Sequence, residues 1–479
     1  MEGELLKDEL NSELTGLNKG EKDKNKKKLI FGIGIGVLLV IIIIIIIIII
    51  TSNKGSSKRK LLGEINCLYD IENIYQPTLF LGNEFKRDSD FEIYIDKKLI
   101  KYSKEYHFKS LGDHEVDIKL YEEINMDYMF KDVQNLISIK MVSDKNCKIT
   151  SMKSTFENCK NLITFYISGF NGDKLLSMQK LFFKSGISRF YIPNNFTSNV
   201  EDMSYMFAYT DIIGFILNDF NTNKVKNMSH IFESCKSLVN MDMSNIDTNK
   251  VEDISYMFHS CEAIIRLNFS DFDTSKVINM SHLFQDCISL SEITISNLDT
   301  SNTEDMSYMF ESCHSLSSID LTNFNTSNAK NISHMFHYCN ILQKIDLSNF
   351  DTKNVEDTSG LFSFCRQLTK IDISNFDLSN NKDMSEMFYD CQLLSEINFG
   401  NIKTNKVTNM SHLFDECSSL TSINLDSFNT ENVLDMSCMF QDCRLLKDLK
   451  IAHFDTKNVQ NMTRMFEECI GLNSLDVSK

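Results

Sequence analysis

The cysteines and histidines are the residues of this chain whose type and spacing could do chemistry. Eleven of the 14 Cys recur at one position of a repeat of 25 or 26 residues. Four of the recurring cysteines have a histidine five residues earlier, at His230, His282, His334 and His412. Such a set could form buried free thiols, disulfides between neighbouring repeats, or a thiolate–imidazole metal site. The recurring positions are Cys159, Cys235, Cys261, Cys287, Cys313, Cys339, Cys365, Cys391, Cys417, Cys443 and Cys469.

A structural ladder of free thiols is the interpretation that the pattern favours. Two shorter repeats place Ser185 and Thr210 at the cysteine position, which indicates a tight inward corner that accepts small side chains. Free cysteine is among the most buried residue types. Disulfides between stacked turns stay as an alternative, although parallel side-chain vectors about 4.8 Å apart give poor disulfide geometry.

The histidine position argues against a metal site. Tyr205, Tyr256, Tyr308 and Glu386 occupy it in other repeats, and a position open to Tyr, His and Glu is expected to face solvent. The chain also has no phosphate-binding glycine loop, nucleophile elbow or metalloprotease helix. We therefore expect no metal, no cofactor and no catalytic residue.

The elements that position these residues are repeats of 25 or 26 residues over 126–479. In a typical repeat Ile345 and Leu347 alternate with Lys344 and Asp346, which predicts a strand with one buried face. The other half opens with Asp or Asn, such as Asn331, and this residue is expected to cap a short helical turn. The Asn-x-Ser version of this opening also matches the N-glycosylation acceptor pattern. Stacked repeats predict an α/β solenoid of about 14 turns with a parallel strand ladder.

The repeat carries a family resemblance. The pattern L-x-x-I-x-L-x-x-F followed by N-M-S-x-M-F-x-x-C-x-S-L resembles the leucine-rich-repeat variant of BspA-like surface proteins, especially the branch described from mycoplasma surface lipoproteins. Phe324, Phe350 and Ile246 stand where ordinary leucine-rich repeats have Asn. The resemblance implies a cell-surface protein that binds proteins or host matrix and has no enzymatic activity.

The outward strand positions are the candidate binding residues. We expect the concave strand face to bind a protein or glycan, since solenoids commonly bind through this surface. A solvated face that merely prevents aggregation, or a calcium ladder of stacked oxygens, are the alternatives. The candidate residues are Asp242, Asn268, Asp320, Asp346, Asp372, Asn398 and Asn424.

Residues 29–50 form an uninterrupted apolar run long enough to cross a bilayer as a helix. A cleaved signal peptide is the alternative, but the run is long and lacks a clear cleavage site. Six lysines at 19–28 precede the run and four basic residues at 54–60 follow it, which favours a cytoplasmic N-terminus and an extracellular or lumenal solenoid. We therefore predict a cytoplasmic head at 1–28, a single transmembrane helix at 29–50 and a stalk at 51–63.

Two further regions complete the organisation. Residues 64–125 lack the repeat, but 91–95 and 116–120 alternate as strands, which predicts a β-rich module that caps the solenoid. The last repeat has no cap, so we expect end-to-end self-association through it. A net charge of −17 over 479 residues argues against nucleic-acid binding. A structural coat or an intracellular scaffold without a specific ligand is the alternative function.

Overall fold

The computed structural model describes residues 59–216, 220–243 and 246–476, and the chain divides into two compact units, Met1–Lys60 and Leu61–Lys479. The second unit is described here. The predicted transmembrane segment at 29–50 lies outside the described residues. Within the described ranges, no helix has the length and apolar character needed to cross a membrane.

The first part of this unit is a seven-stranded sheet with the order β11-β10-β8-β1-β6-β3-β4. β1 alternates strictly between buried and half-buried residues, as a strand over one core does. β3 and β4 pair as a hairpin through a turn in which Asp96 and Lys97 have positive φ. The strands that precede the repeats are β1 Gly63–Ile71, β2 Thr78–Leu79, β3 Phe91–Ile95, β4 Lys98–Ile100, β5 Glu105–Tyr106, β6 Gly112–Leu120 and β7 Ile124–Asn125, of which β2 and β5 pair with each other outside this sheet and β7 pairs with β9.

The same sheet continues into the repeats. β8 Leu136–Val142 pairs antiparallel with β1 on one side and parallel with β10 Thr164–Ser168 on the other. β10 in turn pairs parallel with β11 Arg189–Tyr191. The backbone groups at the start of the repeat stack are therefore paired rather than exposed, which is how a solenoid end avoids unwanted strand addition.

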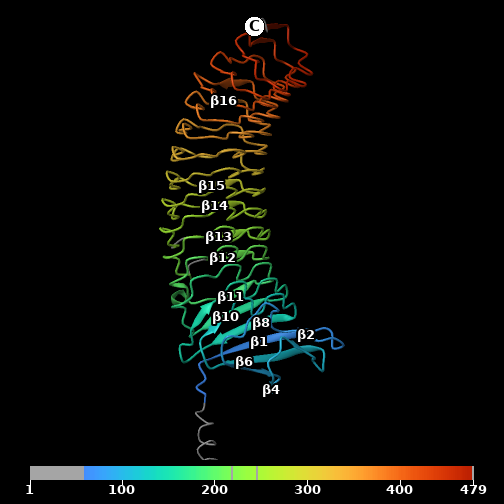
Figure 1. The fold of residues 1–479 in the computed structure, drawn as a ribbon, viewed down its shortest axis with the longest axis vertical. Helices are drawn as coiled ribbons and strands as arrows, with labels where there is room; N and C mark the ends of the chain where they lie inside the picture. Colours follow the sequence, from blue (N-terminus) through green and yellow to red (C-terminus); the bar gives the residue numbers. More distant parts are fainter. Residues whose placement is uncertain (1–58, 217–219, 244–245, 477–479) are drawn as a thin grey trace, which may run out of the picture. The chain divides into compact units, whose positions relative to one another are not determined.

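Beyond this sheet the turns stack in sequence order along the unit (Figure 1). Short parallel strands pair between neighbouring turns, and a second line of parallel bridges links the Asn or Asp that opens each repeat. The repeats form a β-solenoid of about 13 turns, since the fourteen opening residues enclose thirteen steps. The remaining elements are β9 Ile149–Ser151, η1 Asn194–Thr197, β12 Gly214–Ile216, β13 Asn240–Asp242, β14 Arg266–Asn268, β15 Glu292–Thr294, β16 Lys370–Asp372, β17 Glu396–Asn398, β18 Asp448–Lys450 and β19 Ser474–Asp476.

The helical half of each repeat was predicted wrongly. The described residues contain no α-helix, only the 3₁₀ helix η1, so the α/β class is replaced by a β-solenoid. Asn331 does not cap a helix, because its Oδ1 accepts the N–H of Ser333 two residues later, as in an Asx turn. His334 and Tyr338 then have φ of 54° and 58°, in the left-handed region.

Backbone hydrogen bonds explain why this segment is not a helix. The N–H of Phe336 donates to the carbonyl of Leu361 in the next turn, whereas the N–H of Met335 donates back to Ile332. Every second backbone N–H of this segment thus donates to the next turn, so a continuous i→i−4 helical pattern cannot form. Consecutive tight turns place apolar residues on one side of the segment, as a helix does, and their spacing in the sequence therefore resembles that of a helix.

The core of the solenoid contains a continuous stack of phenylalanine rings. The ring centroids of successive turns lie 5.4–6.1 Å apart, with planes inclined by at most 23°. Rings from Phe130 to Phe440 are fully buried, and Phe466 in the last turn is half-buried. Each turn therefore completes its apolar core only against its neighbours.

Candidate functional site

The strand face is the first candidate, and its outward residues follow the predicted alternation. In β16 the outer residues Lys370 and Asp372 are exposed and Ile371 is buried. Asp242 ends β13 beside Ile216 of β12. The predicted binding residues that are exposed along this face are Asn268, Asp320, Asp346, Asp372, Asn398 and Asn424.

These residues have a structural role that the sequence interpretation missed. In each exposed member one side-chain oxygen accepts the backbone N–H two residues later, at 2.9–3.1 Å. They form Asx turns, so one of the two carboxylate oxygens of each Asp and the single side-chain oxygen of each Asn are already used. The sequence did contain a signal for these turns, because Ser, Thr or Gly often stands two residues after the Asp or Asn.

Hydrogen bonding keeps the carboxylates of this face charged. Hydrogen bonds from Thr322 hold the pKa of Asp320 below its ordinary value, and Ser348 has the same effect on the pKa of Asp346. Hydrogen bonds from Ser374, and then from Asn398, lower the pKa of Asp372. A ligand on this face would therefore meet a row of negative charges. The second carboxylate oxygen of Asp320 and of Asp346 remains available, whereas that of Asp372 accepts the Asn398 side-chain amide at 3.0 Å.

Neighbouring outward positions partly neutralise one another. Arg266 of β14 pairs with Glu292 of β15 at 2.8 Å, and Lys370 of β16 pairs with Glu396 of β17 at 2.6 Å. All four side chains are more than half exposed, so these pairs contribute little stability. These ion pairs do not involve the row of Asp and Asn residues, so they do not neutralise its negative charges.

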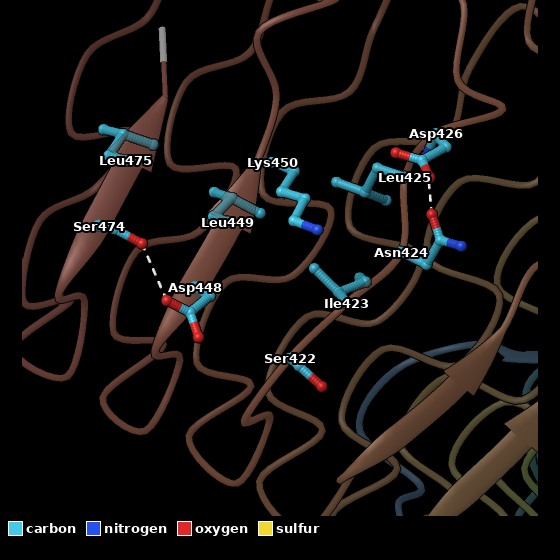
Figure 2. Close-up of a pocket in the computed structure, with 10 residues that line it drawn as sticks. All are labelled: Ser422, Ile423, Asn424, Leu425, Asp426, Asp448, Leu449, Lys450, Ser474 and Leu475. Carbon is cyan, nitrogen blue, oxygen red and sulfur yellow. Dashed lines mark hydrogen bonds between the residues drawn. The ribbon is translucent and has the colours of Figure 1, made fainter.

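The strand face is hollowed near its last described turns, over a volume of about 730 Å³ (Figure 2). Asp426, Asp448 and Lys450 supply charge around it, and the Ser474 hydroxyl donates to Asp448 at 2.8 Å. Leu449 and Leu475 add apolar surface, with Leu475 37% exposed. This mixture suits a ligand with both polar and apolar groups. The end-to-end association expected for this region stays a prediction.

The cysteine ladder lies in the core, where its thiols form hydrogen bonds between turns. All 14 cysteines are free thiols, so the disulfide alternative is not found. Each of the eleven recurring thiols lies 2.9–3.3 Å from the carbonyl oxygen of the phenylalanine one turn earlier, to which it donates. Burial raises the pKa of Cys235 and Cys339 to about 12. These thiols are protonated and unreactive at neutral pH.

The position that alternates between Tyr and His forms a second ladder, here called the corner ladder. It comprises the first left-handed residue of each turn, and six of its rings stack at 4.1–4.7 Å with planes inclined by at most 12°. The rings are half-buried, so this position faces solvent only in part. The six are Tyr205, His230, Tyr256, His282, Tyr308 and His334.

A charged network lines this ring stack. Glu233 is 8% exposed and lies 2.8 Å from both His230 Nδ1 and the Tyr209 hydroxyl. Burial raises the pKa of Glu233, but hydrogen bonds from His230, His259 and Tyr209 outweigh it and hold this pKa well below its usual range. Burial lowers the pKa of His259, but Asp286 and Glu233 outweigh it and raise this pKa to about 9.

A third cluster lies further along the same corner ladder. His412, Asp415 and Cys438 offer ligand-type atoms that all lie within 4.8 Å of one another. The sequence interpretation grouped His412 with Cys417, but Cys417 is buried in the core ladder. The overlooked signal was Cys438, which departs from the regular cysteine spacing and occupies the Tyr/His position instead.

Comparison with known proteins identifies the repeat. A family model described as "Mycoplasma protein of unknown function, DUF285" matches residues 124–209, 186–286, 264–370, 316–420 and 382–479. No curated protein matches the chain. The overlapping matches run from 124 to 479, well over half of the chain, and confirm the expectation of a mycoplasma-type repeat protein. The chain therefore belongs to the DUF285 family of mycoplasma proteins.

Proposed function

We propose that this chain is a membrane-anchored cell-surface protein whose solenoid binds a protein or glycan through its strand face. The observation that carries the binding proposal is the row of exposed Asp and Asn residues at equal positions of successive turns. Equal spacing suits an extended ligand with repeated hydrogen-bond donors. The resemblance to BspA-like leucine-rich-repeat surface proteins supports the same assignment, and no enzymatic activity forms part of it.

The anchor and the orientation are proposed from the sequence. Residues 29–50 would cross the membrane, with 1–28 in the cytoplasm and the solenoid outside. We expect an impermeant protease to remove the solenoid from intact cells that express the full chain. Protection in intact cells, with cleavage after permeabilisation, would contradict the surface location.

Binding is tested by neutralising the strand face without disturbing its turns. The triple variant Asp320→Asn, Asp346→Asn, Asp372→Asn keeps the oxygen that accepts the backbone N–H and removes three negative charges. Cells displaying the full chain are tested for adhesion to immobilised matrix proteins and glycans. We expect adhesion to weaken at least about tenfold, since hydrogen bonds to charged groups contribute most to such recognition.

The repeat supplies a matched control away from the strand. Asp273, Asp351 and Asp377 form equivalent Asx turns in the loop that follows the strand, at 2.9–3.1 Å. The triple variant with Asn at these positions changes the net charge equally and should adhere like the native chain. If both triple variants adhere equally, the strand face is not the binding surface, and the alternative of a coat or scaffold without a ligand is favoured.

A further inference from the structure

The His412–Asp415–Cys438 cluster is built by two adjacent turns. His412 and Cys438 occupy the same corner position one turn apart, with φ of 55° and 56°. Asp415 follows His412 by three residues, and its Oδ2 lies 2.7 Å from His412 Nδ1. His230 and Glu233 have the same relation at 2.8 Å, so the repeat itself sets this geometry. The thiol of the next turn completes a set of one nitrogen, one oxygen and one sulfur.

A buried oxygen in this cluster lacks a partner. The Asp415 side chain is 4% exposed, and its Oδ1 has no hydrogen-bond partner among the described residues. An unsatisfied buried oxygen of a charged group is costly. The comparable acid Glu233 differs, because both its oxygens face donors or histidines. The Oδ1 of Asp415 can therefore still accept or coordinate, whereas neither side-chain oxygen of Glu233 can.

The surroundings favour a positive charge at this point. The Glu416 N–H donates to the Gln441 carbonyl at 2.9 Å, so the backbone beside Asp415 is paired with that of Gln441 in the next turn. Gln441 follows Cys438 by three residues, the relation that Asp415 has to His412, and its Oε1 is also buried without a partner in the described part of the chain. A cation bound by the cluster would satisfy the unpartnered Asp415 oxygen.

We propose that His412, Asp415 and Cys438 bind a zinc ion. Zinc takes imidazole nitrogen, carboxylate oxygen and thiolate sulfur in tetrahedral sites, whereas calcium and magnesium prefer oxygen alone. The Cys438 thiol binds as a thiolate and releases its proton to solvent, so the thiolate and the carboxylate balance the charge of the ion. A water supplies the fourth ligand. This assignment reverses the expectation from the sequence that the chain holds no metal.

The neighbouring cysteines show why Cys438 differs from the ladder thiols. Cys417 and Cys443 are fully buried and donate to Phe388 and Phe414 at 3.2 and 3.1 Å. Cys438 is 8% exposed and has only a long contact of 3.8 Å with the Thr463 carbonyl. His412 is 38% exposed, which gives an ion access from solvent. The repeat does not require a thiol at the corner position, so Cys438 is available as a ligand.

The test is zinc titration of the untagged, reduced full chain against a chromogenic chelator. We expect one tight equivalent of Zn²⁺, and at least about a tenfold loss of affinity in Cys438→Ser and in His412→Ala. Bound Zn²⁺ should also protect Cys438 from alkylation. Co²⁺ in place of Zn²⁺ should give a thiolate-to-metal charge-transfer band that Cys438→Ser abolishes.

The matched control is Cys469→Ser, because Cys469 is the half-buried ladder thiol of the last turn and is the other thiol open to adventitious metal. This variant should keep the affinity and the Co²⁺ band. The proposal is overturned if the native chain binds no tight equivalent, if Cys438→Ser binds as the native chain does, or if Cys469→Ser removes the site. The strand-face variants leave this measurement unchanged.

Discussion

The core side and the corner side of the same turns use their residues in opposite ways. On the core side nearly every turn repeats one phenylalanine and one cysteine, and these are buried and paired with the neighbouring turn. On the corner side the equivalent position holds Tyr, His, Ser, Lys, Gly, Glu, Cys or Arg. Where all turns share a residue, its polar group is used by the repeat. Where turns differ, polar groups remain for other chemistry.

Cys443 and Cys438 show this difference within five residues of sequence. The thiol of Cys443 donates to a core carbonyl, whereas the thiol of Cys438 lies beside an imidazole and a carboxylate. Burial raises the pKa of both thiols, so acidity alone does not distinguish them. Their register in the repeat does, because one is in the core ladder and the other in the corner ladder. Register is therefore more informative here than residue type.

The largest effect is expected from breaking the core side. Phe336→Ala removes a fully buried ring that stacks between Phe310 and Phe362 at 5.6 and 5.8 Å. We expect the free energy of unfolding to fall by about 3–5 kcal/mol, measured by chemical denaturation. Ile341→Ala, at a side chain 41% exposed in the same turn, should change it by no more than about 0.5 kcal/mol. Equal losses for the two variants would mean that the ring stack is not the main support.

The corner side should respond to pH. The pKa of His259 is raised to about 9, above its unfolded value of about 6.5, by Asp286 and Glu233 against the opposing effect of burial. The imidazolium therefore stabilises the fold fully below about pH 6.5, and this contribution is lost as pH rises through 9. We expect about 3 kcal/mol to be lost between pH 6 and pH 10 in the native chain relative to His259→Gln. Parallel stability curves for the two proteins would contradict the charged network.

The sequence predicted what depends on repetition. The period, the parallel strand ladder, the exposed row that includes Asp346 and the buried cysteines all followed from side chains that recur at fixed spacing. It mispredicted the segment after Asn331, because apolar spacing cannot tell a helical turn from successive tight turns. The distinction lies in backbone donors shared between turns, and a single repeat does not contain the partner carbonyls.

The candidate sites could be predicted less well, for a related reason. Asp346 was recognised as outward-facing, but its Asx turn with Ser348 was not, because one oxygen can both end a strand and face solvent. The His412–Asp415–Cys438 cluster joins two turns at a position that elsewhere carries tyrosine or histidine. Proximity between turns becomes visible only when the register of the corner position is known.

The smallest effect tests the backbone that makes the corner possible. Glu416 has φ of 58° at the second left-handed position of its turn, where a side chain is disfavoured and glycine is not. Glu416→Gly and Glu416→Ala both remove a carboxylate that is crowded by Asp390 and Asp415, so only the Cβ atom distinguishes them. We expect the glycine variant to be more stable than the alanine variant by about 1 kcal/mol in thermal unfolding. If the alanine variant is equally stable, the left-handed backbone at Glu416 carries no strain that glycine relieves.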